Sequence, residues 1–134
     1  MSPELFWMAA VAVMTALLWV PYILSVLIEM GPVNALTGRV GDDPGQTAWA
    51  ARAQHAHRNA IENLVVFAPL AIGVHVAGAG TETTALAAMI YFWARLAHYV
   101  VYCAGIPVVR TLIFAVGVLC QVTLGVALLG AAPV

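Results

Sequence analysis

The stretch that decides the fold of this chain runs from Leu5 to Ile28. It reads LFWMAAVAVMTALLWVPYILSVLI, which is 24 residues without a charged side chain. A second uncharged run of the same length extends from Thr111 to Val134. A helix that crosses a bilayer needs about 20 apolar residues, so each run is long enough to span a membrane. Spanning β-strands would instead appear as alternating segments of about ten residues, and the sequence shows no such pattern.

The composition of the whole chain agrees with a membrane protein. Of its 134 residues, 63% are hydrophobic and only 8% are charged, with five Arg, six acidic residues and no Lys. An average soluble domain is about 25% charged, so these side chains cannot cover a water-exposed surface. Disorder is excluded because it requires low hydrophobicity and high charge. A net charge of −1 without Lys also leaves no basic patch for nucleic acid.

Two further runs complete the set of spans. Residues 63–81 carry no charge apart from the titratable His75, and residues 83–104 are interrupted only by Arg95. The connections at 77–82 and 105–107 are short, which makes neighbouring helices antiparallel. We therefore predict one all-α domain over residues 1–134, an integral membrane four-helix bundle of antiparallel up-down topology. Its expected helices cover residues 5–28, 47–77, 83–104 and 108–131.

The arginines predict how the bundle is oriented. All five lie in or near the long connection 29–46 or on the side of the 105–107 turn; they are Arg39, Arg52, Arg58, Arg95 and Arg110. The positive-inside rule places these two connections in the cytoplasm and both termini on the non-cytoplasmic side. We interpret the first apolar run as a retained span, because it is too long for a signal peptide and is preceded by Glu4 rather than by positive charge.

Polar side chains form a stripe on each of the two middle helices. The first stripe is spaced by 3, 4 and 3 residues, and its members are Arg52, His55, Asn59 and Glu62. The second is spaced by 4, 3 and 4 residues, and its members are Tyr91, Arg95, His98 and Tyr102. At 3.6 residues per turn the first set falls within an arc of roughly 80°. Because a charge near the bilayer centre costs about 2.5–3.5 kcal/mol, two stripes at matching depth indicate a shared polar site.

A purely structural interpretation remains open for part of this pattern. Arg95 and Glu62 could form a buried ion pair that fixes helix packing. That pair would not explain why Arg52, His55 and Asn59 lie on the same face of the helix as Glu62. Arg58 lies off the stripe, and we interpret it as a solvated residue at headgroup level.

Metal and haem sites are not expected. His55 and His57 are two positions apart, so on a helix their side chains point roughly 200° apart and cannot chelate one ion. His75 and His98 are the intramembrane candidates for haem ligation, but they belong to opposite halves of the bilayer.

Three segments resemble the MAPEG family, the membrane-associated proteins in eicosanoid and glutathione metabolism. Residues 56–63, AHRNAIEN, with Phe67 after them, resemble the family signature of the second helix. Residues 91–98, YFWARLAH, with Tyr102, resemble the signature of the third, and PVVRT at 107–111 resembles the start of the fourth. The A-H-x-N-x-x-E-N spelling is most similar to the microsomal glutathione transferases.

The resemblance implies a homotrimer with glutathione as co-substrate, bound at subunit interfaces that open to the cytoplasm. A hydrophobic small molecule or a lipid would be the other partner, drawn from the surrounding membrane lipids. Arg110 would be the catalytic residue that stabilises the glutathione thiolate. The residues implied in glutathione binding are Arg52, His55, Asn59, Glu62, Arg95, His98 and Tyr102.

Two positions depart from the family pattern. His55 stands where relatives usually have Arg, with Arg52 one turn earlier to compensate, and Asn63 replaces the Tyr of the leukotriene-synthase branch. The leading hypothesis is a membrane glutathione S-transferase, with peroxidase activity as an additional option. The alternative is a protein of the same fold that binds a thiol or a lipid without transferase activity. A bundle with a purely structural role is a third.

Overall fold

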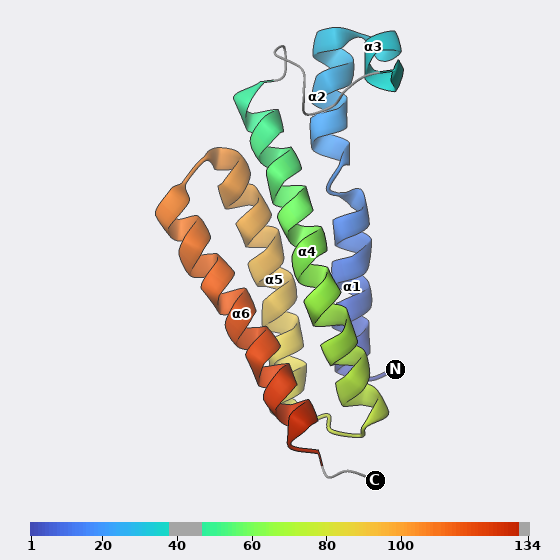
Figure 1. The fold of residues 1–134 in the computed structure, drawn as a ribbon, viewed down its shortest axis with the longest axis vertical. Helices are drawn as coiled ribbons and strands as arrows, with labels where there is room; N and C mark the ends of the chain where they lie inside the picture. The colour runs from blue at the N-terminus through green and yellow to red at the C-terminus, as the bar shows by residue number, and fades with distance from the viewer. Residues whose placement is uncertain (38–46, 132–134) are drawn as a thin grey trace.

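The regular elements of the structure are helices throughout the residues that it describes, which are 1–37 and 47–131 (Figure 1). In this computed structural model they are α1 (Pro3–Leu17), α2 (Val20–Met30), α3 (Pro32–Thr37), α4 (Ala48–Val76), α5 (Glu82–Ala104) and α6 (Pro107–Leu129). Within these described residues, four stretches are long and apolar enough to cross a membrane, namely Pro3–Met30, Ala48–Val76, Glu82–Ala104 and Pro107–Leu129. The expectation of an all-α fold with four membrane spans is confirmed.

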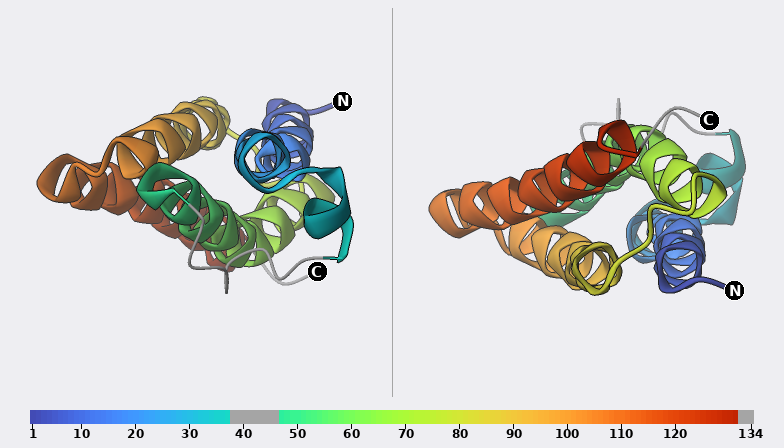
Figure 2. Two further views of the ribbon diagram at one scale, coloured as in Figure 1. Left: turned by 90° about the horizontal axis from the view of Figure 1, so that it is seen from above. Right: turned by 90° about the horizontal axis from the view of Figure 1, so that it is seen from below.

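The four long stretches lie side by side, with α4 and α5 in the middle. Each of these two helices contacts α1 and also α6, and Figure 2 shows α1 and α6 on opposite sides of them. The N-terminus and the α4–α5 connection lie at one end of the bundle, and the α5–α6 turn lies at the other end, together with α2 and α3 (Figure 1). The two helices that carry the polar stripes are therefore the two inner ones.

The first span is not the single helix that we predict over residues 5–28. It consists of α1 and α2, which are separated at Leu18 and Trp19. Pro21 explains the break, because it has no backbone N–H and its ring clashes with the carbonyl four residues earlier in a regular helix. Tyr99 of α5 donates a hydrogen bond of 2.9 Å to the Leu18 carbonyl, which satisfies a backbone group that the break leaves open.

Tyr99→Phe is expected to lower the thermal midpoint of unfolding by a few degrees in detergent. The substitution leaves the buried Leu18 carbonyl without this partner, and such a loss costs about 1–3 kcal/mol. Thr111→Val is a suitable control, because the Thr111 hydroxyl donates only to the Pro107 carbonyl of its own helix and is exposed. Circular dichroism melts would contradict the role given to Tyr99 if both variants melted like the unsubstituted protein.

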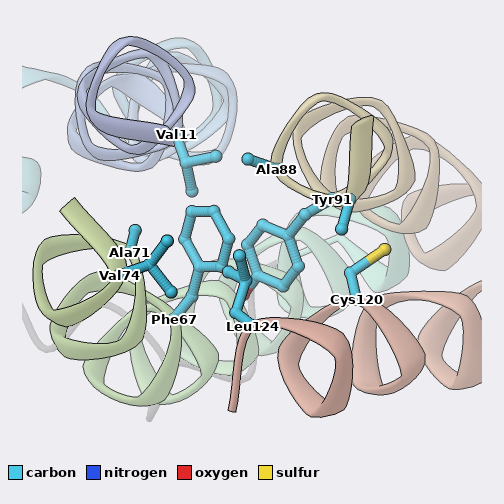
Figure 3. Close-up of a cluster of buried hydrophobic side chains, with 9 residues drawn as sticks. Val11, Phe67, Ala71, Val74, Ala88, Tyr91, Cys120 and Leu124 are labelled. Carbon is cyan, nitrogen blue, oxygen red and sulfur yellow. The ribbon is translucent and has the colours of Figure 1, made fainter. Parts of the chain in front are cut away.

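Two clusters of buried side chains hold the helices together. The larger one surrounds the stacked rings of Phe67 and Tyr91, whose centroids are 3.8 Å apart and whose planes differ by 9° (Figure 3). The other joins α2 to α4 through a row of small residues on α4 that allows close approach: Ala50, Ala53, Ala56 and Ala60. Tyr91, the first member of the α5 stripe, is therefore a core residue one helical turn from Arg95.

Candidate functional site

Arg95 of α5 lies at the centre of the polar region. Its side chain is 2% exposed, and its Nη2 donates a 2.5 Å hydrogen bond to Oδ1 of Asn59 on α4. Gly117 of α6 lies beside the stem of the arginine, since a Cβ built there would be in ordinary contact with the Arg95 Cδ at 3.9 Å. The Arg95 Nε is buried and has no hydrogen-bond partner. The guanidinium is therefore enclosed by three helices and keeps one donor unused.

No carboxylate neutralises this charge among the described residues. Glu62 is exposed on α4 and forms no ion pair with Arg95, so the buried pair considered from the sequence does not form. A buried cation without a counter-ion is destabilising, and in a membrane it marks a ligand or ion site more often than a packing device. Within the described residues, the guanidinium therefore has neither a carboxylate partner nor an acceptor for its Nε.

A second group of side chains lies towards the end of the bundle that carries the α5–α6 turn. The guanidinium carbon of Arg110 lies 4.3 Å from the centre of the Tyr102 ring, which is a cation–π contact. His98 meets the same ring edge to face at 5.7 Å and lies 6.2 Å from the ring of Phe114. His98 is buried, whereas Tyr102 and Arg110 are half-buried.

Arg52 attaches α4 to the α5–α6 turn. Its Nε donates a 2.9 Å hydrogen bond to the carbonyl of Cys103, at the C-terminal end of α5. A cation is favoured there by the unsatisfied carbonyls and by the helix dipole. Gly105, which ends α5 in a left-handed conformation at φ 76°, lies against the guanidinium, and a Cβ at this position would be 3.3 Å from the Arg52 Nε. The turn is therefore fixed both by glycine and by arginine.

The structure brings some of the predicted site residues together and leaves others at the surface. Arg95 contacts Asn59, Arg110 contacts Tyr102, and Arg52 reaches the turn between these helices. His55 and Glu62 are exposed and make no hydrogen bond, ion pair or ring contact within residues 1–37 and 47–131. The α4 stripe thus crosses from the interior of the bundle to its outer surface. Arg39 lies outside the described residues.

Two amide side chains that were not among the predicted site residues also belong to this region. Asn63 Nδ2 donates to the Asn59 carbonyl at 2.9 Å, and Gln121 Nε2 of α6 donates to the Asn63 carbonyl at 3.2 Å. Gln121 also lies 3.4 Å from the Tyr91 hydroxyl. The available signal was that Gln121 is the one amide in the apolar run 111–134.

The neighbouring histidine and arginine of the α4 motif have other surroundings. His57 Nδ1 is 2.8 Å from the hydroxyl of Tyr22 on α2, so this ring helps to hold the second half of the first span against α4. Arg58 is exposed. In the part of the chain that the structure describes, no cluster of three or more His, Cys, Asp or Glu could hold a metal ion.

Comparison with known protein families gives a match along almost the whole chain. The model of the MAPEG family matches residues 5–130. A comparison with curated proteins and a comparison with solved structures each returned no match. The family match covers the four candidate spans except for Pro3 and Glu4, and it includes the polar residues of α4, α5 and α6 described above. This chain is therefore an integral, multi-pass membrane protein that belongs to the MAPEG family.

Proposed function

We propose that the protein is a membrane glutathione S-transferase that acts on lipophilic electrophiles. One observation carries this proposal: Arg95 is buried, lacks a counter-ion among the described residues and keeps its Nε without a partner. Glutathione has two carboxylates and one ammonium group, so its site requires several cations and one acid. Arginine suits carboxylates because its planar guanidinium binds them through two parallel hydrogen bonds. Membership of the MAPEG family supports a glutathione-related activity.

The roles that we propose follow the two groups of side chains. Arg95 and Asn59 bind a carboxylate of glutathione, and Glu62 binds its ammonium group. Tyr102 and His98 contact the peptide, while Arg52 and His55 complete the positive side of the site. Arg110 stabilises the thiolate.

The proposed reaction starts with loss of the thiol proton to solvent. The thiolate sulfur then forms a bond to an electrophilic carbon, and the leaving group, for example a halide, departs with the electron pair of the broken bond. A thiol has a pKa of about 8.5, and only the thiolate is a good nucleophile. Lowering this pKa by about two units requires roughly 2.7 kcal/mol of preference for the anion. A preorganised arginine in a site of low dielectric supplies an effect of this size.

We also propose that the site is completed by a second copy of the chain within a homotrimer. His55 and Glu62 are exposed on a helix that is long and apolar enough to cross a membrane. Charged and polar groups at membrane depth face a protein interior or a cavity, so another subunit is the expected cover. We propose in addition that the α5–α6 turn and the site mouth face the cytoplasm and both termini face the other side, which the distribution of the arginines supports.

The lipophilic substrate would reach the thiolate from the bilayer. An apolar groove of about 290 Å³ lies on the outer face of α5 and α6, within the membrane spans. Its lining is Ile90, Trp93, Ala94, Ala97, Ile113 and Val116. Neither arginine lines this groove, but Ile113 is one helical turn from Arg110, so we propose that an apolar molecule in the groove approaches the thiolate from the side of α6.

Detergent-purified protein mixed with glutathione and a chromogenic aryl halide tests the proposal. We expect conjugation above the uncatalysed rate and an ultraviolet thiolate band when glutathione is added. Conjugation at background rate without a thiolate band would contradict the transferase function. Glutathione binding without turnover would instead support a thiol-binding protein of the same fold. Native mass measurement in mild detergent should give three chains, and a monomer would contradict a site shared between subunits.

A further inference from the structure

A chain of amide groups connects Arg95 to the middle of α6. Arg95 donates to the Asn59 side chain, Asn63 donates to the Asn59 backbone carbonyl, and Gln121 donates to the Asn63 backbone carbonyl. Gln121 is 8% exposed, and the Tyr91 hydroxyl beside it belongs to a side chain that is 0% exposed. Three helices are therefore joined by a hydrogen-bonded path that begins at the buried cation.

The chemistry of the donors fixes which way each amide points. A guanidinium has only donors, so the Asn59 atom that faces Arg95 must be the oxygen. The Asn59 Oδ1 also lies 3.4 Å from the Asn63 Nδ2. Two donors therefore converge on this one oxygen, and the Asn59 NH₂ group makes no hydrogen bond within the described residues. The half-buried Asn59 thus presents donors to whatever occupies the site.

Asn63 is held in turn from the opposite side. Its Nδ2 must donate to the Asn59 backbone carbonyl, because that carbonyl can only accept. The Gln121 Nε2 donates to the backbone of Asn63 at 3.2 Å and so fixes the distance between α6 and this turn of α4. Side-chain hydrogen bonds between membrane helices contribute about 0.6–2 kcal/mol each, so this bond helps to hold α4 and α6 in one relative position.

We propose that Asn63 and Gln121 are positioning residues, which hold the Asn59 amide with its NH₂ group towards a carboxylate or carbonyl oxygen of the bound thiol peptide. This inference rests on the proposed function for the identity of the ligand. Neither residue needs to touch the ligand. Loss of Asn63 removes one of the two donors on the Asn59 oxygen, and loss of Gln121 removes the bond that holds this turn of α4 to α6. In either case the Asn59 NH₂ group is held less firmly towards the ligand.

The test uses nuclear magnetic resonance of the protein in detergent, with its asparagine residues labelled with a magnetic nitrogen isotope. The chain has three Asn residues, namely Asn34, Asn59 and Asn63, so the side-chain NH₂ signals in the spectrum are few. Asn63→Leu and Gln121→Met remove the two proposed donors from different helices. Asn34→Leu is the matched control, because Asn34 is an exposed amide on α3 that bonds only to the Met30 carbonyl.

We expect the Asn59 NH₂ signal to shift in Gln121→Met and in Asn63→Leu before glutathione is added. Both variants should bind glutathione about five- to tenfold more weakly by calorimetry, as expected for the loss of one hydrogen bond. Their turnover at saturating glutathione should stay within about twofold, because the thiolate site is untouched. The control should change neither the signal nor the affinity. Gln121→Met still decides the question if Asn63→Leu fails to fold.

The outcomes separate this inference from the proposed function. If the unsubstituted protein binds no glutathione, the proposed function fails, and the Asn59 signal alone then decides whether Asn63 and Gln121 set its orientation. If the unsubstituted protein binds glutathione and both variants bind it equally well, the positioning role is overturned. An Asn59 signal that is unchanged in both variants overturns it as well.

Discussion

Replacing Arg95 with Met is expected to weaken glutathione binding by more than about a hundredfold while leaving the free protein at least as stable as before. The guanidinium supplies a buried charge, and removing one member of a buried charge pair costs about 2–5 kcal/mol in binding. Without ligand, however, no carboxylate of the described residues compensates this charge. Methionine has a similar length and removes the desolvation penalty, so the thermal midpoint should stay level or rise.

The opposite directions of the two effects make this prediction specific. Calorimetry with glutathione and thermal melts of the free protein measure them separately. Arg58→Met is the matched control, because it removes an exposed arginine from the same part of the bundle and should change neither quantity much. A variant of Arg95 that unfolds earlier and binds glutathione normally would show that Arg95 is a packing residue.

Arg110→Ala should lower turnover by about a hundredfold and change glutathione affinity much less. If Arg110 supplies the roughly 2.7 kcal/mol that holds the thiol ionised, its loss returns the thiol pKa to its ordinary value, and the thiolate band should disappear at neutral pH. The side chain lies over the Tyr102 ring, 4.3 Å from its centre, so its position depends on that aromatic face. Steady-state kinetics and the ultraviolet spectrum of the glutathione complex measure the two consequences.

Two further variants test whether Arg110 stabilises the thiolate. Tyr102→Phe keeps the aromatic face beneath Arg110 and should retain most of the thiolate band. Glu62→Ala should mainly raise the concentration of glutathione that is needed for half-maximal rate, because Glu62 is proposed to bind the ammonium group. If Glu62→Ala reduced turnover and Arg110→Ala reduced only affinity, the two roles would have to be exchanged.

The spacing of polar residues predicted which of them lie on one face of α5, because a single helix geometry governs that pattern. Residues three and four apart share a face, so the 4, 3, 4 pattern of α5 placed Arg95, His98 and Tyr102 on one side, and the structure buries or half-buries all three. The α4 stripe was defined by the same rule. The side chains of this stripe spread over an arc of the α4 surface that lies partly inside the bundle and partly on its outside. Asn59 therefore faces Arg95, while Glu62 is exposed.

Features that depend on contacts between helices could not be predicted from spacing. The hydrogen bond from Arg52 to the Cys103 carbonyl needs the relative height of α4 and α5, which no pattern within one helix contains. The Asn63–Gln121 connection needs the height of α6 as well. The break in the first span is different, because Pro21 was visible in the sequence and its missing N–H gave the local reason.

The unequal lengths of the helices set how far the protein stands out of the bilayer. At 1.5 Å per residue, the 29 residues of α4 extend about 43 Å, whereas the hydrocarbon core is about 30 Å thick. The 23 residues of α5 extend only about 35 Å. We therefore expect the first turns of α4, which carry Arg52, to project into the headgroup layer and the adjacent water. A charged, water-soluble peptide would reach Arg52 from that layer without entering the hydrocarbon core. An apolar molecule would approach along α5 and α6 without leaving the hydrocarbon core.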